Sequence, residues 1–137
     1  FVSEIGGKKY YNDSAATIPE AVIEALKRFS GGIILIAGGV DKGSDYKGLA
    51  EKIKEKASSL ILLPGTGTDK LKRELEKLGF KELLLAENMR EAVSESSSLK
   101  GDIVLLSPGG SSFNLFKNEF DRGEKFNKEV ERLKNEG

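Results

Sequence analysis

The sequence predicts a three-layer α/β domain in which a mostly parallel β-sheet lies between helices on both of its faces. Four short apolar runs, residues 33–37, 60–63, 83–86 and 103–106, are continuous rather than alternating, which is typical of strands covered on both faces. Segments with a helical spacing of apolar residues separate these runs. Because strands that alternate with helices form right-handed βαβ units, we expect most of the strands to run parallel.

The first element in chain order is a predicted β-hairpin, in which Gly6 and Gly7 form a turn between residues 2–5 and 8–11. Five helices are predicted after it, because apolar residues recur at helical spacing between the strands and near the end of the chain. These residues are Val22, Leu26 and Phe29; Leu49 and Ile53; Leu71, Leu75 and Leu78; Met89 and Val93; and Phe126, Val130 and Leu133.

Capping residues predict where the helices begin. A helix is expected to start near Ser111, with Ser111 or Ser112 as its N-cap. Elsewhere an N-cap residue is followed three positions later by Glu, which is the spacing of a capping box. These predicted pairs are Thr17 with Glu20, Asn88 with Glu91 and Asp121 with Glu124.

Length and composition indicate one domain, residues 1–137, and exclude several functions. Basic and acidic residues number 22 each, so the chain lacks the basic excess of nucleic-acid and membrane-surface proteins. With neither Cys nor His, it has no disulfide, thiol nucleophile, Cys/His zinc site or Ser-His-Asp triad. The apolar runs are too short to span a membrane and no leader opens the chain, so we expect a cytoplasmic protein. The 32% of charged residues is typical of thermophilic proteins.

The loops after the strands are the candidate binding region, because ligands of open parallel sheets gather beyond the carboxyl ends of the strands. These loops are residues 12–14, 38–43, 64–68 and 107–112. Two glycine-rich motifs in them do not predict a nucleotide site. Ser44 stands where a P-loop requires Lys, and Gly65-Thr66-Gly67 lacks the third glycine of a dinucleotide fingerprint.

A small anion suits these loops better. Free N–H groups at the helix start near Ser111 favour a carboxylate or phosphate, and Lys42 adds a positive charge from a loop flanked by glycines. Thr17 and Asp13 offer a hydroxyl and a carboxylate beside them. Structural roles account equally well for these residues: an N-cap for Thr17, an Asx-turn for Asp13 and a solvated loop for Lys42. Residue chemistry alone leaves both interpretations open.

Four ordered blocks of the sequence occur together at characteristic spacings. They are Tyr-Asn-Asp-Ser-Ala-Ala-Thr at 11–17, Gly-Gly-Val-Asp-Lys-Gly-Ser-Asp-Tyr at 38–46, Leu-Ser-Pro-Gly-Gly-Ser-Ser-Phe at 106–113, and Phe-Lys-Asn at 116–118 with Arg122-Gly123. In order and spacing these blocks resemble the C-terminal domain of the Mur ligases of peptidoglycan synthesis, a domain similar to a Rossmann fold. The family usually has Lys at the position of Ala15, and the aromatic residue that follows its Phe-Lys-Asn segment stands one place later here, at Phe120.

The resemblance is nearest to the ligases that add D-glutamate to UDP-N-acetylmuramoyl-L-alanine, with ATP, through an acyl phosphate. It implies that Thr17, Lys42, Ser112 and Phe113 contact D-glutamate and that Asp13 reaches the nucleotide, with no catalytic or metal-binding residue in this chain. ATP, Mg²⁺ and the UDP-sugar would bind mainly to upstream UDP-binding and central ATPase domains that this chain lacks, so the isolated domain would be inactive. The resemblance further implies a monomer with no nucleic-acid or membrane partner.

An alternative of another class stays open: a stand-alone Rossmann-like module that binds a small anion or a partner without catalysis. The parent reading frame separates the two, because a ligase requires about two further domains and a Gly-x-x-Gly-Lys-Thr/Ser phosphate loop. A relative of folylpolyglutamate synthase is disfavoured by the block at 107–113 and by the Phe-Lys-Asn segment.

Overall fold

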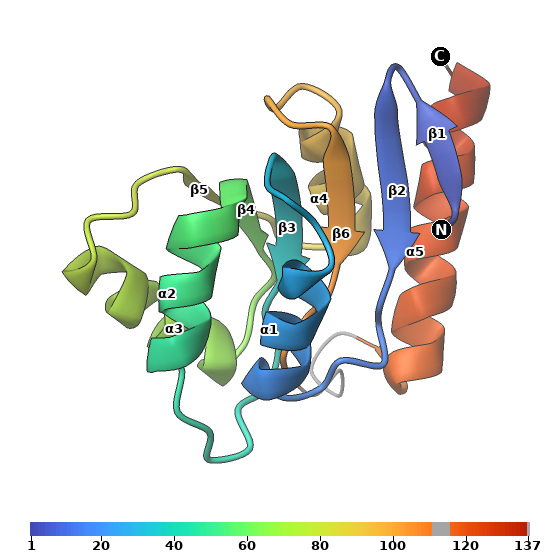
Figure 1. The fold of residues 1–137 in the computed structure, drawn as a ribbon. Helices are drawn as coiled ribbons and strands as arrows, with labels where there is room; N and C mark the ends of the chain where they lie inside the picture. The colour runs from blue at the N-terminus through green and yellow to red at the C-terminus, as the bar shows by residue number, and fades with distance from the viewer. Residues whose placement is uncertain (111–115, 137) are drawn as a thin grey trace.

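A mixed six-stranded sheet forms the centre of the computed structural model, which describes residues 1–110 and 116–136 (Figure 1). The strand order is β1-β2-β6-β3-β4-β5, with β1 antiparallel to β2 and every other neighbouring pair parallel. The strands are β1 (Ser3–Ile5), β2 (Lys8–Asn12), β3 (Ile33–Ala37), β4 (Ala57–Leu62), β5 (Leu83–Leu85) and β6 (Ile103–Leu106).

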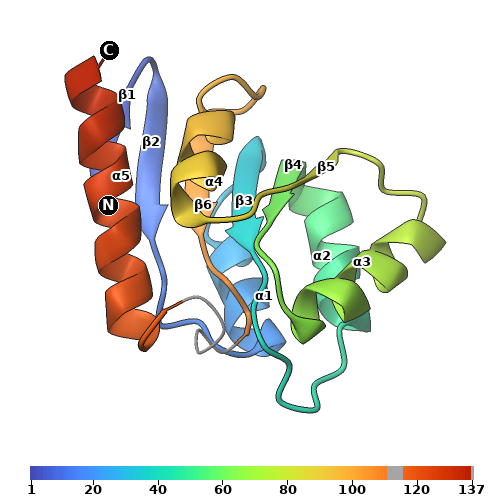
Figure 2. The same cartoon turned by 180° about the vertical axis from the view of Figure 1, so that it is seen from behind.

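Helices cover both faces of this sheet, so the predicted three layers are confirmed (Figures 1 and 2). Alternate residues of the central strands enter two separate cores: Leu35 packs with the side of α1, α2 and α3, and Ile36 with the side of α4 and α5. The helices are α1 (Pro19–Lys27), α2 (Lys47–Lys56), α3 (Thr66–Lys77), α4 (Met89–Ser96) and α5 (Glu119–Glu136). None of them, among the described residues, is long and apolar enough to cross a membrane.

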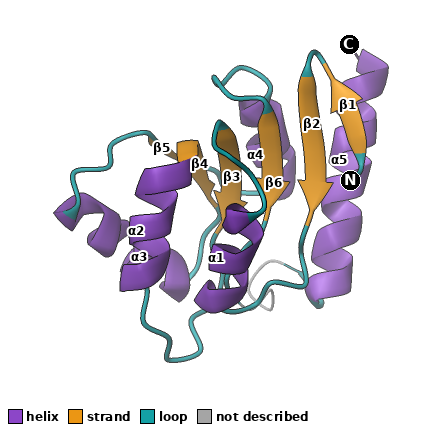
Figure 3. Cartoon of the chain, viewed as in Figure 1, coloured by secondary structure: helices purple, strands orange, loops and turns teal. Residues whose placement is uncertain are grey.

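The predicted strands and hairpin are all present, with differences at two of them (Figure 3). Strand β4 begins at Ala57, before the apolar run, because Ala57 and Ser59 already pair with Ile33 and Ile34 of β3. The expectation that every apolar run is covered on both faces is wrong for β5. This strand lies at the sheet edge, where Leu85 is 58% exposed.

The predicted capping box at α1 is wrong. The N-cap position is Ile18, without any side-chain cap, and Pro19 is the first helical residue. The Thr17 hydroxyl makes no hydrogen bond within the described part of the chain. Proline accounts for this start by itself, since its fixed φ suits the first turn and its missing N–H removes one donor that a cap would have to satisfy.

At α5 the predicted cap is also displaced. The helix begins at Glu119, so Asp121 lies in its first turn rather than before it. The Asn118 side chain caps the helix by accepting from the Asp121 N–H (2.8 Å), and the Asp121 carboxylate accepts in turn from the Lys117 N–H (3.1 Å). The predicted cap of α4 is confirmed, because Asn88 Oδ1 accepts from the Glu91 N–H (2.9 Å).

Candidate functional site

The carboxyl ends of five parallel strands lie at one edge of the sheet, the lower edge in Figure 1. Backbone hydrogen bonds join the loops that leave this edge. The Gly38 N–H, after β3, donates to the Pro108 carbonyl, after β6 (2.8 Å), and the Gly109 N–H donates to the Ala16 carbonyl, after β2 (2.8 Å). The three loops therefore form one connected surface, as expected for ligand sites of parallel sheets.

Thr17 lies on this surface next to Ala16, whose carbonyl is held by Gly109. Its side chain is partly exposed and is free of hydrogen bonds to the described residues. Because Thr17 does not cap α1, the structural role considered for it does not apply, and its hydroxyl can donate to a ligand.

Asp13 follows β2 and is tied to the loop after β6. The Ser107 hydroxyl donates to Asp13 Oδ2 (2.9 Å), and the Asp13 N–H donates to the Leu106 carbonyl (2.7 Å). The Asx-turn considered as an alternative role for Asp13 is made instead by Asn12, whose Oδ1 accepts from the Ser14 N–H (3.0 Å). Among the described residues Asp13 Oδ1 has no partner, so one carboxylate oxygen stays available at the edge.

Lys42 belongs to the loop between β3 and α2, and this loop projects beyond the sheet edge (Figure 1). Its side chain is exposed and has neither an ion pair nor a hydrogen bond with the described residues. The loop around it is nevertheless well held. Asp41 Oδ1 accepts from the N–H groups of Gly43 and Ser44 (both 3.0 Å), which closes a tight turn with Lys42 inside it.

The Asp41 carboxylate has two further partners. Its Oδ1 accepts from the Tyr46 hydroxyl (3.2 Å), and its Oδ2 forms an ion pair with Lys70 of α3 (2.5 Å). The Lys70 ammonium and the backbone donors lower the pKa of Asp41 to about 2. Burial, together with the negative charge of Asp41, raises the pKa of Tyr46 to about 12. The phenol therefore stays neutral and keeps donating at physiological pH.

The Gly65-Thr66-Gly67 segment packs against the same loop, which explains its glycines without a phosphate. The Asp41 N–H donates to Thr66 Oγ1 (2.9 Å), and the Gly67 N–H donates to the Gly39 carbonyl (2.9 Å). A Cβ on Gly67 would lie 2.7 Å from the Tyr46 hydroxyl oxygen, closer than packed atoms approach. Close packing of α3 on the Lys42 loop requires glycine here.

Arg122 of α5, to which the sequence analysis gave no role, forms hydrogen bonds to both the loop after β2 and the loop after β6. Only 1% of this residue is exposed. Its Nε and Nη2 donate to the hydroxyl (3.1 Å) and carbonyl (2.7 Å) of Ser14, and its Nη1 donates to the Gly110 carbonyl (2.9 Å). Burial lowers the pKa of Arg122 to about 10. The Arg122-Gly123 pair, part of the fourth resembling block, was the signal available in the sequence.

Ser112 and Phe113, together with the cap expected at Ser111 or Ser112, lie outside the described residues. Their neighbour Gly110 is held by Arg122, and a Cβ on Gly110 would come within 3.1 Å of the Gly39 backbone. Gly110, the last described residue before Ser112 and Phe113, therefore lies beside the loop that follows β3.

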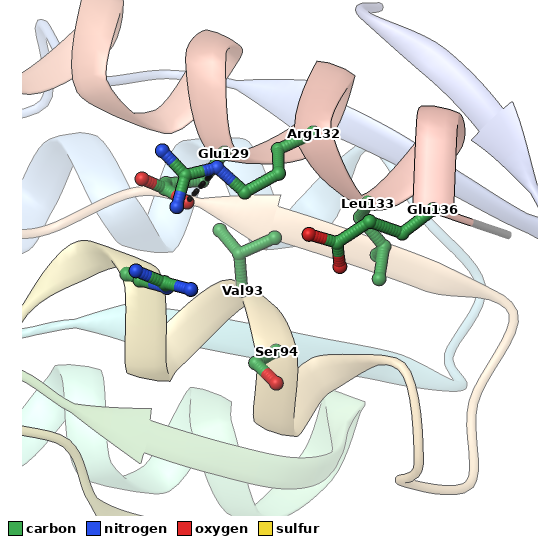
Figure 4. A pocket seen from close by; sticks show the side chains of 7 residues that line it. Val93, Ser94, Glu129, Arg132, Leu133 and Glu136 are labelled. Atoms are coloured by element: carbon green, nitrogen blue, oxygen red, sulfur yellow. Dashed lines mark ion pairs between the residues drawn. The ribbon is translucent and has the colours of Figure 1, made fainter.

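One surface hollow lies at this edge of the sheet, and another lies away from it. One of about 340 Å³ lies between Asp13, Ala15 and the start of α5, with the 75%-exposed Phe120 on its rim. The other, of about 100 Å³, lies between α4 and α5 and is lined by surface side chains such as Arg132, which pairs with Glu129 at 3.6 Å (Figure 4). Only the first contains a predicted site residue, Asp13.

Fold and site define an α/β domain that can position a small anionic ligand at the carboxyl edge of its sheet. The family model described as "Mur ligase, glutamate ligase domain" matches residues 1–110. The chain therefore belongs to the Mur ligase family, and its Rossmann-like fold is the one that the resemblance implied.

Similar proteins agree with this assignment. The chain is 43% identical over 136 residues to a UDP-N-acetylmuramoylalanine--D-glutamate ligase of Pelotomaculum thermopropionicum, covering 98% of the chain and 30% of that protein. It is 42% identical to the ligase of the same name from Caldicellulosiruptor bescii, covering 97% of the chain and 29% of that protein. The crystal structure of the UDP-N-acetylmuramate-alanine ligase MurC of Thermotoga maritima shares the fold, with a TM-score of 0.61 and 17% identity over 98% of the chain and 29% of that structure. The chain thus spans less than a third of the length of these relatives.

Proposed function

We propose that residues 1–137 form the C-terminal, amino-acid-binding domain of an ATP-dependent ligase that joins D-glutamate to UDP-N-acetylmuramoyl-L-alanine in peptidoglycan synthesis. The observation that carries this proposal is the 43% identity, over nearly the whole chain, to a protein of that name. The geometry supports it, because Thr17 and Lys42 present side chains without a partner among the described residues, on loops at one sheet edge.

D-Glutamate carries two carboxylates, and this chain supplies donors for them. The Lys42 ammonium forms a charge-assisted hydrogen bond with one carboxylate, and the Thr17 hydroxyl donates a neutral one. Ser112 and Phe113 are proposed to complete the contact with a hydroxyl and neighbouring backbone. None of these groups is a general base, so the contribution of the domain is to hold the amine in position and to exclude water.

In the proposed reaction the terminal phosphoryl group of ATP passes to the carboxylate of the UDP-sugar substrate, and ADP leaves. The amine nitrogen of D-glutamate then attacks the acyl carbon, phosphate leaves and the nitrogen loses its proton. Asp13 fits a nucleotide ribose, because its Oδ1, which has no partner among the described residues, can accept from hydroxyl groups. We assign Mg²⁺, the phosphates of ATP and the UDP-sugar to other domains of a full-length, monomeric, cytoplasmic ligase.

The first experiment measures phosphate release from ATP by the full-length protein in the presence of UDP-N-acetylmuramoyl-L-alanine. D-Glutamate, L-glutamate and other amino acids are added singly, and Lys42→Ala is measured beside the wild type. We expect stimulation by D-glutamate alone. In Lys42→Ala we expect the KM for D-glutamate to rise about tenfold or more, the loss typical of a charge-assisted hydrogen bond, with a lower kcat.

Each other outcome removes a defined part of the proposal. Stimulation by a different amino acid keeps the ligase and discards D-glutamate. A Lys42→Ala variant with unchanged amino-acid kinetics removes Lys42 from the site. No stimulation by any amino acid leaves the alternative of a binding module without catalysis.

A further inference from the structure

Lys42 has no ion pair with the described residues, which is unexpected because a carboxylate stands directly beside it in the chain. Asp41 precedes Lys42, and Asp45 follows three residues later. A flexible lysine in water readily pairs with a carboxylate within its reach. Lys42 nevertheless has no ion pair with the described residues, so the other partners of these two carboxylates decide whether its charge stays available.

Asp41 is already saturated by other groups. Two backbone N–H groups and the Tyr46 hydroxyl donate to its Oδ1, and the Lys70 ammonium lies 2.5 Å from its Oδ2. The side chain of Asp41 is only 11% exposed, whereas that of Lys70 reaches it from α3 and is 44% exposed. Asp45 has a separate role, because its Oδ1 accepts from the Lys47 N–H at the start of α2 (2.9 Å).

We propose that Lys70 is a positioning residue for the amino-acid site: by occupying the Asp41 carboxylate, it prevents the neighbouring Lys42 from pairing there and leaves the Lys42 ammonium for a ligand carboxylate. This inference rests on the proposed function of Lys42. The low pKa of Asp41 agrees with it, since the carboxylate is charged, and therefore able to capture a lysine, throughout the physiological range.

The test uses amino-acid kinetics of the full-length protein. Lys70→Met removes the ammonium and keeps the length of the side chain, so Asp41 can turn to Lys42, and the KM for D-glutamate should rise at least about threefold. Lys70→Arg should retain the wild-type KM, because the guanidinium also pairs with a carboxylate. Lys77→Met is the matched control. Lys77 lies on the same helix, is 68% exposed and pairs, among the described residues, with Glu74 alone (3.3 Å), so the KM of this variant should stay unchanged.

A double variant separates this role from a merely structural one. Asn at position 41 still accepts from the Gly43 and Ser44 N–H groups but has no charge to capture Lys42. Asp41→Asn combined with Lys70→Met should therefore return the KM to within about twofold of the wild type. If the ion pair only stiffens the loop, Asp41→Asn alone raises the KM as much as Lys70→Met does, and the double variant shows no recovery, which overturns the inference.

The parallel Lys42→Ala variant distinguishes the two proposals. A raised KM in Lys42→Ala with an unchanged KM in Lys70→Met overturns the role of Lys70 and keeps the site. An unchanged KM in Lys42→Ala overturns the site and the role of Lys70 together.

Discussion

Replacing Arg122 by Met is expected to destabilise the domain strongly although no ion pair to a carboxylate is broken among the described residues. The guanidinium makes three hydrogen bonds, to the hydroxyl and carbonyl of Ser14 and to the Gly110 carbonyl. Hydrogen bonds to a charged group contribute about 1.5–3 kcal/mol each, so the three together contribute roughly 5–9 kcal/mol. The shorter Met side chain fills only part of the space and leaves these acceptors without their donors.

The burial of the charge offsets part of this contribution. The pKa of Arg122 falls from 12.5 to about 10 in the folded state. At about 1.4 kcal/mol per pH unit this corresponds to roughly 3 kcal/mol of desolvation, which Met avoids. The expected net loss in the free energy of unfolding is therefore about 2–6 kcal/mol, or a fall in Tm of at least about 6 °C for a domain of this size.

Urea unfolding of the purified 137-residue chain, followed by circular dichroism, measures this loss. Arg132→Met is the control, because Arg132 is 47% exposed with one ion pair to Glu129, and its loss should stay below about 1 kcal/mol. Arg122→Lys should recover only part of the stability, since an ammonium cannot reach three acceptors in the planar geometry of guanidinium. Equal unfolding midpoints for Arg122→Met and Arg132→Met would refute the reasoning.

Two further predictions concern stability. Because the folded-state pKa of Asp41 is lowered to about 2 from 3.8, its contribution is present above about pH 4 and is lost as the pH falls toward 2; the urea midpoint should show this dependence, and Asp41→Asn should reduce it. An Asp41→Asn profile identical to the wild type contradicts this. Asn88→Ala should cost about 1 kcal/mol through the lost cap of α4, whereas Thr17→Ala should leave stability nearly unchanged and raise only the KM for the amino acid. A similar stability loss in both variants would show that Thr17 does cap α1.

Local patterns predicted most of the fold. The strands were found from runs such as 33–37, and the helices from spacings such as Val22 to Leu26, because these patterns reflect which faces of an element are buried. The same reasoning was wrong for β5, whose run 83–86 looks like that of a central strand. Leu85 is exposed because β5 lies at the edge of the sheet, and the residues around Leu85 in the sequence do not indicate that edge position.

The candidate site was predicted in part. The edge that gathers Asp13, Thr17 and Lys42 followed from the parallel topology, and the structure joins the loop of Asp13 and Thr17 to the loop of Lys42 through the loop after β6. The hydrogen-bond partners of these side chains could not be predicted from the sequence. A carboxylate and a hydroxyl near a helix start suit a turn, a cap or a ligand equally well, and only the contacts show that Asp13 binds Ser107 while Asn12 makes the turn.

The sequence by itself determined the order of strands and helices along the chain, the family, and the edge at which a ligand would bind. Burial periodicity and ordered motifs are properties of neighbouring residues, and the alternation of strands with helices implies a parallel sheet. The tertiary structure decided which charges are available. Arg122 lies more than a hundred residues from Ser14, and Lys70 more than twenty from Asp41, yet these contacts hold the loops and occupy the carboxylate beside Lys42. Hydrogen bonds and ion pairs act over a few ångströms in space, so partners brought together by folding cannot be read from their spacing in the sequence.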